Sequence, residues 1–143
     1  DSGLAPSRVE IELTESMALT SDAAQSAVAQ LHALGVRLSL DDFGTGHSTL
    51  SNLLQLPIHG IKIDRSFVTD LDSNRDQQAL VTSLIELTGK LGLSITAEGI
   101  EHVAQLAFLR QAGCGYAQGY HFGRPQPLLA PGELATPLSS ATG

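Results

Sequence analysis

The sequence predicts an α/β protein built on a parallel β-sheet, and two observations lead to this prediction. Short stretches rich in branched aliphatic residues alternate with longer stretches in which apolar residues recur at helical spacing. The helical stretches end at Gly35, Gly92 and Gly113, and each of these glycines comes shortly before the next strand-like stretch. Strands that alternate with helices pair in parallel through right-handed crossovers, so we expect about five βα units.

The first elements lie in the N-terminal part of the chain. Residues 9–13 (Val-Glu-Ile-Glu-Leu) predict a strand, and Ser21 or Asp22 can cap the helix that follows. The apolar stripe of this helix consists of Ala24, Ala27, Val28, Leu31 and Leu34. Residues 36–40 predict the second strand, and a short helix is expected over residues 48–54.

The same alternation continues in the second half. Residues 60–63 (Gly-Ile-Lys-Ile) predict a third strand, and residues 75–91 predict a longer amphipathic helix. Residues 93–97 predict a fourth strand, a helix follows over about 103–109, and residues 115–118 predict a short fifth strand. A closed eight-stranded barrel needs roughly 250 residues. The sheet is therefore either open, or its first units lie before Asp1.

The composition restricts the function. The 143 residues suffice for one domain, which we expect over residues 1–130, with residues 131–143 as a mobile tail. No apolar run approaches the ~20 residues that cross a bilayer, and the single cysteine, Cys114, cannot form an internal disulfide, so we expect a cytoplasmic domain. A net charge of −7 with eight Lys and Arg residues argues against binding to a DNA or RNA duplex. An anionic substrate is compatible with this charge if metal ions supply the positive charge.

Polar residues recur where the predicted strands end. They are Glu12, Asp41, Asp42, Lys62, Glu98 and Gln118. Because the strands of a parallel barrel point the same way, these side chains should converge at the mouth where barrel enzymes keep their active sites. Each motif alone also has a structural explanation: an Asp-Asp pair before a glycine is typical of a turn, and a lone Lys is typical of an edge strand. Their joint placement at successive strand ends favours a site.

Carboxylates gathered at one mouth predict metal binding. Two like charges ~4 Å apart repel by on the order of 4 kcal/mol at an effective dielectric of 20, and a divalent cation between them removes this cost. Ligands that are all oxygen point to Mg²⁺ or Mn²⁺. Two such ions ~3.5–4 Å apart suit in-line phosphodiester cleavage, in which Lys62 supplies a positive charge for a phosphoryl oxygen or the attacking hydroxide.

Five motifs resemble, in order, those of the EAL domain family. They are Glu12-Leu13-Thr14-Glu15, Asp41-Asp42-Phe43-Gly44-Thr45-Gly46, Lys62-Ile63-Asp64-Arg65-Ser66-Phe67-Val68, Ala97-Glu98-Gly99-Ile100-Glu101 and Gln118-Gly119-Tyr120-x-Phe122-x-x-Pro125. The resemblance runs from about Val9 to Pro127. It implies a TIM-like (β/α) barrel, represented here by about five C-terminal βα units. It also implies hydrolysis of cyclic-di-GMP to linear pGpG with two Mg²⁺ or Mn²⁺ ions, in bacterial second-messenger signalling.

The resemblance further implies roles for individual residues. Glu12 and Asp41 resemble the ligands of one ion, and Asp41 and Asp42 resemble those of the other, with Asp41 bridging. Lys62 resembles the residue that orients the attacking water, and Glu98 resembles either a ligand of the second ion or the general base. The remaining matches resemble supporting groups (Asp64, Glu101, Gln118), a residue that steadies the loop (Glu15), the loop itself (Gly44, Thr45, Gly46) and the lining of a guanine pocket (Phe122, Pro125).

The chain departs from the family pattern in two ways. The Glu-Ala-Leu segment that names the family and an Asn ligand would both lie before Asp1, so we expect this chain alone to be a poor catalyst. His47 stands where the family usually has an aromatic residue. We also expect fusion to regulatory domains upstream. An open sheet of five units predicts exposed apolar strand faces and therefore a homodimer or aggregation.

Two other functions stay open. One is a catalytically silent cyclic-di-GMP receptor or protein-interaction module, although such members usually lose the carboxylates that this chain keeps. The other follows from the strand-end residues alone and is an enolase-like barrel with Mg²⁺ carboxylates and a Lys base. The Asp-Asp pair and the Gln-Gly-Tyr motif have no evident role in that second alternative.

Overall fold

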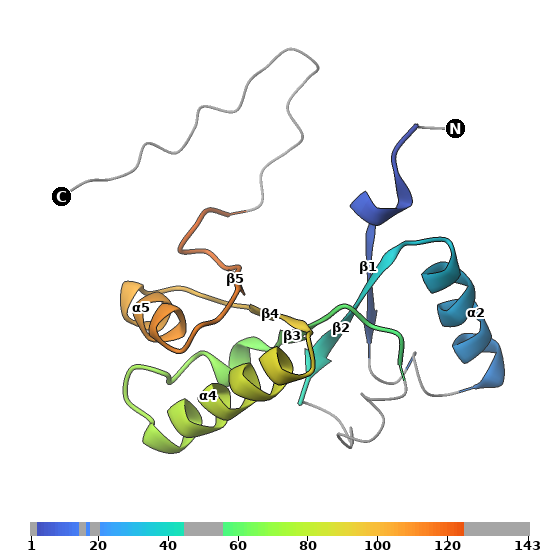
Figure 1. The fold of residues 1–143 in the computed structure, drawn as a ribbon. Coiled ribbons are helices and arrows are strands. Elements are labelled where there is room, and N and C mark those ends of the chain that lie inside the picture. The colour runs from blue at the N-terminus through green and yellow to red at the C-terminus, as the bar shows by residue number, and fades with distance from the viewer. Residues whose placement is uncertain (1–2, 15–16, 18–20, 45–55, 125–143) are drawn as a thin grey trace, which may run out of the picture.

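The computed structural model describes residues 3–14, 17, 21–44 and 56–124. Five strands form one parallel sheet in which each strand pairs with the next along the chain (Figure 1). They are β1 (Glu10–Thr14), β2 (Arg37–Phe43), β3 (Gly60–Ile63), β4 (Ser94–Ala97) and β5 (Tyr116–Ala117). The predicted α/β class with βα units in series is confirmed.

Three helices connect the strands in the described part of the chain. They are α2 (Asp22–Ala33), α4 (Arg75–Lys90) and α5 (Val103–Gln111), and two short 3-10 turns, η1 (Pro6–Arg8) and η2 (Arg65–Phe67), precede β1 and follow β3. The Ser21 side chain accepts a hydrogen bond from the Ala24 N–H at 3.2 Å, as expected of an N-cap. Gly35, Gly92 and Gly113 have positive φ angles, which confirms the predicted helix ends. The helix expected over residues 48–54 lies outside the described residues.

The outer face of the sheet packs against the helices. Alternate strand residues such as Leu38, Leu40, Ile61, Ile63 and Ile95 form one buried cluster with Val28 of α2, Val81 and Ile85 of α4, and Leu106 and Leu109 of α5. Because neighbours in a parallel sheet point to the same side, the registered pairs determine which residues share this face. The apolar half of each strand is therefore buried under helices.

The inner face of the sheet is polar. It carries Glu10, Glu12 and Thr14 of β1, Arg37, Ser39 and Asp41 of β2, Gly60 and Lys62 of β3, Ser94 and Thr96 of β4, and Tyr116 of β5. An open pocket of about 300 Å³ lies against this face, between Glu10 and Arg37 at one end and Lys62 and Gln118 at the other. The expectation of exposed apolar strand faces is therefore wrong for the described residues.

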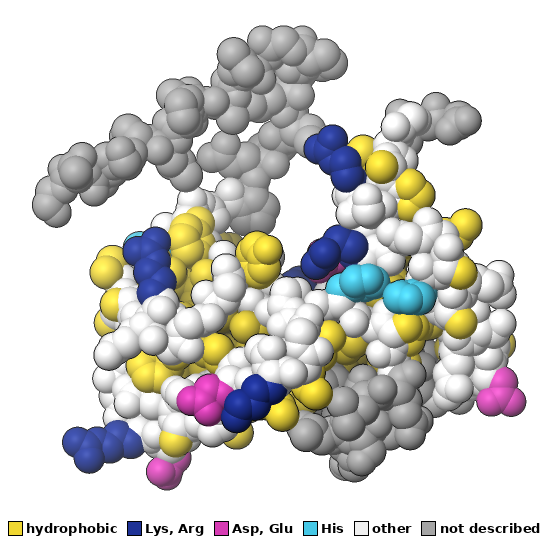
Figure 2. All heavy atoms as spheres, viewed as in Figure 1, with side chains coloured by type: hydrophobic (Ala, Val, Ile, Leu, Met, Phe, Trp, Pro, Cys, Tyr) yellow, Lys and Arg dark blue, Asp and Glu magenta, His cyan; other side chains and the backbone are white. Residues whose placement is uncertain are grey.

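On the face that Figure 2 draws, Lys and Arg side chains are spread over several elements. None of the helices among the described residues is long and apolar enough to cross a membrane.

Candidate metal centre

A β-bulge in β2 aims two adjacent carboxylates at the same site. Leu40 pairs with Ile61 and Phe43 pairs with Ile63, so β2 holds one more residue than β3 over this stretch. Asp42 accommodates the extra residue with a φ of 54°, and no other non-glycine residue in the described part of the chain has a positive φ. In a regular strand Asp41 and Asp42 would point to opposite faces. The bulge therefore explains how both can serve one centre.

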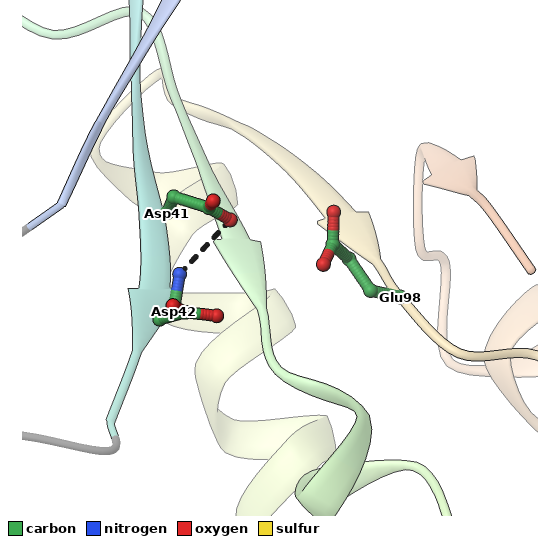
Figure 3. Close-up of side chains that lie close together, drawn as sticks. All are labelled: Asp41, Asp42 and Glu98. Carbon is green, nitrogen blue, oxygen red and sulfur yellow. Dashed lines mark hydrogen bonds between the residues drawn. The ribbon is translucent and has the colours of Figure 1, made fainter.

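Three carboxylates meet at this point. Oxygens of Asp41, Asp42 and Glu98 all lie within 4.8 Å of one another, and Figure 3 shows Glu98 reaching from the end of β4 towards the pair on β2. The Asp41 Oδ1 also accepts a hydrogen bond from the Asp42 N–H at 3.0 Å, which orients the Asp41 carboxylate. Asp41 and Glu98 are half-buried, and Asp42 is exposed. Their side chains thus form an acidic cluster that solvent can reach.

Lys62 forms ion pairs with two of these carboxylates and with Glu12. Its Nζ is 2.8 Å from Glu12 Oε1, 2.5 Å from Glu98 Oε1 and 3.8 Å from Asp41 Oδ1. Burial of the ammonium group lowers its pKa, but the hydrogen bonds to Glu12 and Glu98 and the charges of Glu98 and Asp41 raise the pKa more, to above the ordinary value of 10.5. These partners favour the protonated form of Lys62, whereas the enolase-like alternative needs a Lys that can act as a base.

The donor set fits Mg²⁺ or Mn²⁺. The three clustered groups are all carboxylates, and their oxygens all lie within 4.8 Å of one another. Ligand oxygens on opposite sides of a six-coordinate Mg²⁺ ion lie about 4.2 Å apart, so a shared ion is compatible with this limit. Two carboxylates 4.8 Å apart repel by on the order of 3 kcal/mol at an effective dielectric of 20, and Lys62 offsets part of this repulsion through its ion pairs with Asp41 and Glu98. A divalent cation between them would relieve this repulsion. Glu12, which pairs with Lys62, lies outside the three-carboxylate group.

The supporting residues named from the sequence lie in different surroundings. Gln118 follows β5 and lines the inner-face pocket together with Glu12 and Lys62. The Asp64 carboxylate instead accepts from the Ser66 N–H at 2.9 Å and so caps η2. Glu101 is exposed, and Phe122 lines a separate pocket between α5 and β5 beside Cys114. Glu15, Thr45, Gly46 and Pro125 lie outside the described residues.

Sequence reasoning missed one buried polar residue near the centre. Gln105 lies on α5 between the apolar stretches of that helix and is 2 % exposed. Its amide oxygen accepts from the Glu101 N–H, and its amide nitrogen donates to the Val68 carbonyl. A polar residue directly before Leu106 on the buried face of a predicted helix was the available signal, because such a residue needs hydrogen-bond partners inside the protein.

Comparison with known proteins identifies a family model and relatives that match most of this chain. The family model described as EAL domain matches residues 1–125. Cyclic di-GMP phosphodiesterase NbdA of Pseudomonas aeruginosa is 43% identical over 129 residues, which cover 90% of this chain and 16% of that protein. The chain spans between 16% and 19% of the length of the curated relatives that it matches.

Solved structures match both the fold and the sequence. The PaMucR phosphodiesterase in complex with c-di-GMP has a TM-score of 0.79 and 45% identity, over 87% of this chain and 51% of that chain. The manganese/cy-diGMP complex of Klebsiella pneumoniae BlrP1 has a TM-score of 0.80 and 35% identity, over 86% of this chain and 32% of that chain.

Proposed function

Since this chain belongs to the EAL domain family, we propose that it supplies metal-binding carboxylates and a lysine to a site that hydrolyses cyclic-di-GMP to the linear dinucleotide. One observation carries the proposal: Asp41, Asp42 and Glu98 converge at one edge of the sheet, and Lys62 forms ion pairs with two of them. Relatives named as cyclic di-GMP phosphodiesterases and a manganese/cy-diGMP complex of a similar structure support the choice of substrate and metal.

The carboxylates would hold Mg²⁺ or Mn²⁺ in two groups. Asp41 and Asp42 would hold one ion and Glu12 and Asp41 the other, with Asp41 shared. Glu98 lies within reach of the first group, where it serves either as a ligand or as the general base for the attacking water. Bound ions of this kind act as Lewis acids towards phosphoryl oxygens and lower the pKa of a bound water.

Lys62 orients the nucleophile in this proposal. Its ammonium group stays protonated and is held by Glu12 and Glu98, so it can donate hydrogen bonds to a water or to a phosphoryl oxygen without taking a proton. The open pocket beside Lys62, with Gln118 on its rim, offers room for part of the substrate.

Hydrolysis by the full-length protein that contains this chain tests the proposal. We expect linear dinucleotide to form with Mn²⁺ or Mg²⁺ and to stop forming when EDTA is added. Lys62→Met should keep Mn²⁺ binding and lose turnover by roughly 100-fold or more, because the shape is kept and the charge is lost. Lys90→Met, on the exposed end of α4, is the matched control and should keep full turnover.

Two results would redirect the assignment. Tight binding of cyclic-di-GMP by the full-length protein without metal-dependent hydrolysis would identify a receptor. Failure to bind the dinucleotide at all, with or without metal, would overturn the proposed substrate.

A further inference from the structure

The η2 turn that follows β3 lies between the segment that carries Asp42 and the segment that carries Glu98. On one side, a Cβ placed on Gly44, two residues after Asp42, would lie 2.6 Å from the ring of Phe67 in η2. On the other side, a Cβ on Gly99, next to Glu98, would collide with the Arg65 side chain. Both glycines have positive φ angles, 95° and 70°. Only glycine allows such a close approach at these positions, so η2 is packed tightly against the neighbours of Asp42 and Glu98.

The Gln105 side chain forms hydrogen bonds with the residues that follow η2 and with the residues that follow Glu98. Its amide nitrogen donates to the Val68 carbonyl at 3.1 Å and to the Thr69 carbonyl at 3.2 Å. Its amide oxygen accepts from the Glu101 N–H at 2.9 Å and from the His102 N–H at 3.0 Å. A carboxamide has two donor hydrogens and one acceptor oxygen with two lone pairs, so all four hydrogen-bonding positions of this buried side chain are filled.

These contacts connect the two partners of the central ion pair. Lys62 is at the end of β3, six residues before Val68, whose carbonyl accepts from Gln105. Glu98 is three residues before Glu101, whose N–H donates to Gln105. Resting on the function proposed above, we propose that Gln105 is a positioning residue, whose amide fixes the distance and orientation between Lys62 and Glu98 for the reaction.

Two substitutions of similar shape separate positioning from folding. Gln105→Met removes all four hydrogen bonds, and Gln105→Glu keeps the acceptor towards Glu101 and His102 while placing oxygen against the Val68 and Thr69 carbonyls. In the full-length protein we expect both to lower kcat by roughly 10- to 100-fold, because small displacements of catalytic groups have effects of this size. KM should change less than about threefold if the groups are displaced and the substrate surface is intact.

The pH profile of the glutamate variant is the readout that a purely structural role would not change. As the pH falls from about 8 to about 5.5, the new carboxyl group is protonated and regains one O–H donor towards the two carbonyls. The ratio of its kcat to the wild-type kcat should therefore rise, while the ratio for Gln105→Met stays constant. Gln111→Glu makes the same chemical change at an exposed position at the end of the same helix and should keep the wild-type kcat throughout.

Wild-type kcat in Gln105→Glu at every pH would overturn the proposal, as would a loss of kcat in both variants that matches their unfolded fraction by circular dichroism. If the wild-type protein does not hydrolyse cyclic-di-GMP, the proposed function fails but the positioning role is still tested. In that case Gln105→Met should weaken Mn²⁺ binding about tenfold and speed hydrogen exchange at the Glu101 and His102 amides. Unchanged Mn²⁺ affinity and exchange in that variant would reject the positioning role.

Discussion

At the scale of single residues, Asp42 combines an unusual backbone with the side chain of a proposed metal ligand. Its φ of 54° is one that asparagine and glycine adopt easily and alanine adopts at a cost of about 1 kcal/mol. We therefore predict that Asp42→Asn keeps the stability of the wild type and loses metal-dependent turnover by at least about 100-fold. Thermal unfolding and hydrolysis in the presence of Mn²⁺ measure the two effects.

Two further variants at this position provide controls. Asp42→Gly removes the ligand and relieves the backbone, and Asp42→Ala removes the ligand and adds strain, so the glycine variant should be the more stable of the two by about 1 kcal/mol. Turnover at the wild-type level in Asp42→Asn would contradict the assignment of this residue as a metal ligand.

The sequence explains where most of these side chains lie, and Asp42 is the exception. Alternation along the strands is enough to place Asp41 and Lys62 on the inner face, and Glu98 follows directly at the end of β4. The same alternation would send Asp42 to the outer face. The bulge that returns it depends on the pairing of β2 with β3, which is a tertiary contact with no local signal beyond the Asp-Asp pair itself.

Asp64 predicts a dependence of stability on pH. Hydrogen bonds from the Ser66 hydroxyl and the Ser66 N–H lower the pKa of this carboxyl group below its ordinary value of 3.8. The stabilisation is fully present above the pKa of the unfolded chain and is lost as the pH falls through the folded pKa. Asp64→Asn keeps an acceptor for η2 without the charge, so we expect it to be less stable than the wild type near neutral pH and equally stable at the acid end.

Melting temperatures measured from about pH 7 down to about pH 3 test this prediction. Asp72→Asn, in the connection between β3 and α4, is the matched control. The gap between its melting temperature and that of the wild type should not close as the pH falls. A gap between Asp64→Asn and the wild type that widens as the pH falls would contradict the assignment.

At the scale of elements, β2 differs most from its prediction. The sequence predicts a strand over residues 36–40, because Asp-Asp-Phe-Gly is typical of a turn. In the structure β2 continues to Phe43, since Thr14 pairs with Asp41 on one side and Ile63 pairs with Phe43 on the other. Pairing with two neighbouring strands outweighs the local turn preference, and it brings Asp41 and Asp42 into the sheet itself.

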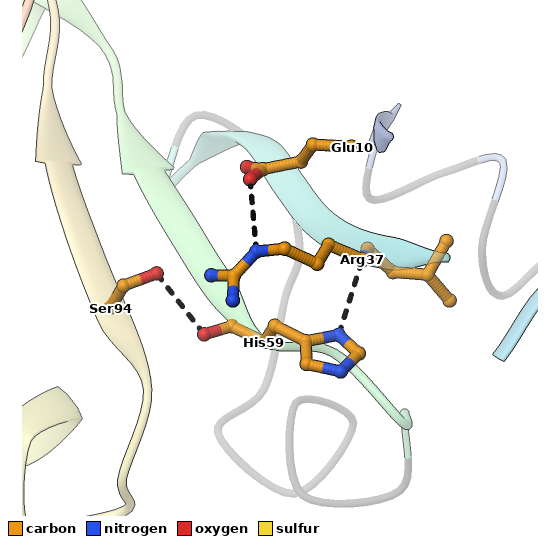
Figure 4. Close-up of polar contacts among 5 residues, drawn as sticks. Glu10, Arg37, His59 and Ser94 are labelled. Atoms are coloured by element: carbon orange, nitrogen blue, oxygen red, sulfur yellow. Dashed lines mark hydrogen bonds and ion pairs between the residues drawn. The ribbon is translucent and has the colours of Figure 1, made fainter. Parts of the chain in front are cut away.

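His59 directly precedes β3 and forms hydrogen bonds with β2 and β4, at the end of the sheet opposite to the carboxylates. Its Nδ1 accepts from the Leu38 N–H at 3.1 Å, and its own N–H donates to the Leu38 carbonyl at 2.7 Å. Its carbonyl accepts from the N–H and the hydroxyl of Ser94, and Figure 4 shows the Ser94 hydroxyl contact beside the Glu10–Arg37 ion pair. The histidine side chain thus replaces a backbone acceptor at the start of β2.

We predict that His59→Ala lowers the free energy of unfolding by about 1–3 kcal/mol, because it leaves the half-buried Leu38 N–H without an acceptor. His59→Asn places an amide oxygen near the position of Nδ1 and should recover most of this loss. Urea unfolding measures the difference, and His121→Ala, at an exposed position, should change the free energy of unfolding by less than about 0.5 kcal/mol. Equal stabilities of His59→Ala and His59→Asn would show that the acceptor is unimportant.

At the scale of the whole molecule, the two faces of the sheet explain why the fold was easier to predict than its surface. Helical periodicity and glycine stops identify the βα units, and these determine a parallel sheet almost by themselves. The same strands also carry acidic and basic residues at alternate positions, so the inner face is polar: Glu10 pairs with Arg37, and Glu12 with Lys62. Homodimer formation through apolar strand faces therefore loses its physical reason, and the homodimer itself stays a prediction.

Metal binding should stabilise the whole sheet, because the proposed ligands come from β1, β2 and the end of β4. A ligand that binds only the folded state at 100 times its Kd raises the free energy of unfolding by about 2.7 kcal/mol. We predict an increase of this size when Mn²⁺ is added, and its reversal by EDTA. The double variant Asp41→Asn with Glu98→Gln should lose this increase, because two of the proposed ligands are gone. Each variant is compared with itself without metal, because the same substitutions also remove two ion pairs of the buried Lys62.

The size of the Mn²⁺ increase within each variant makes the test specific. A variant that merely damages the fold would be less stable but would keep the Mn²⁺ increase, whereas loss of a metal site removes the increase itself. Glu86→Gln, on the exposed side of α4, removes a carboxylate far along the chain from the centre and should retain the full Mn²⁺ increase. An undiminished increase in the double variant would mean that Mn²⁺ binds elsewhere, and the convergence of Asp41, Asp42 and Glu98 would then have to be explained without a metal.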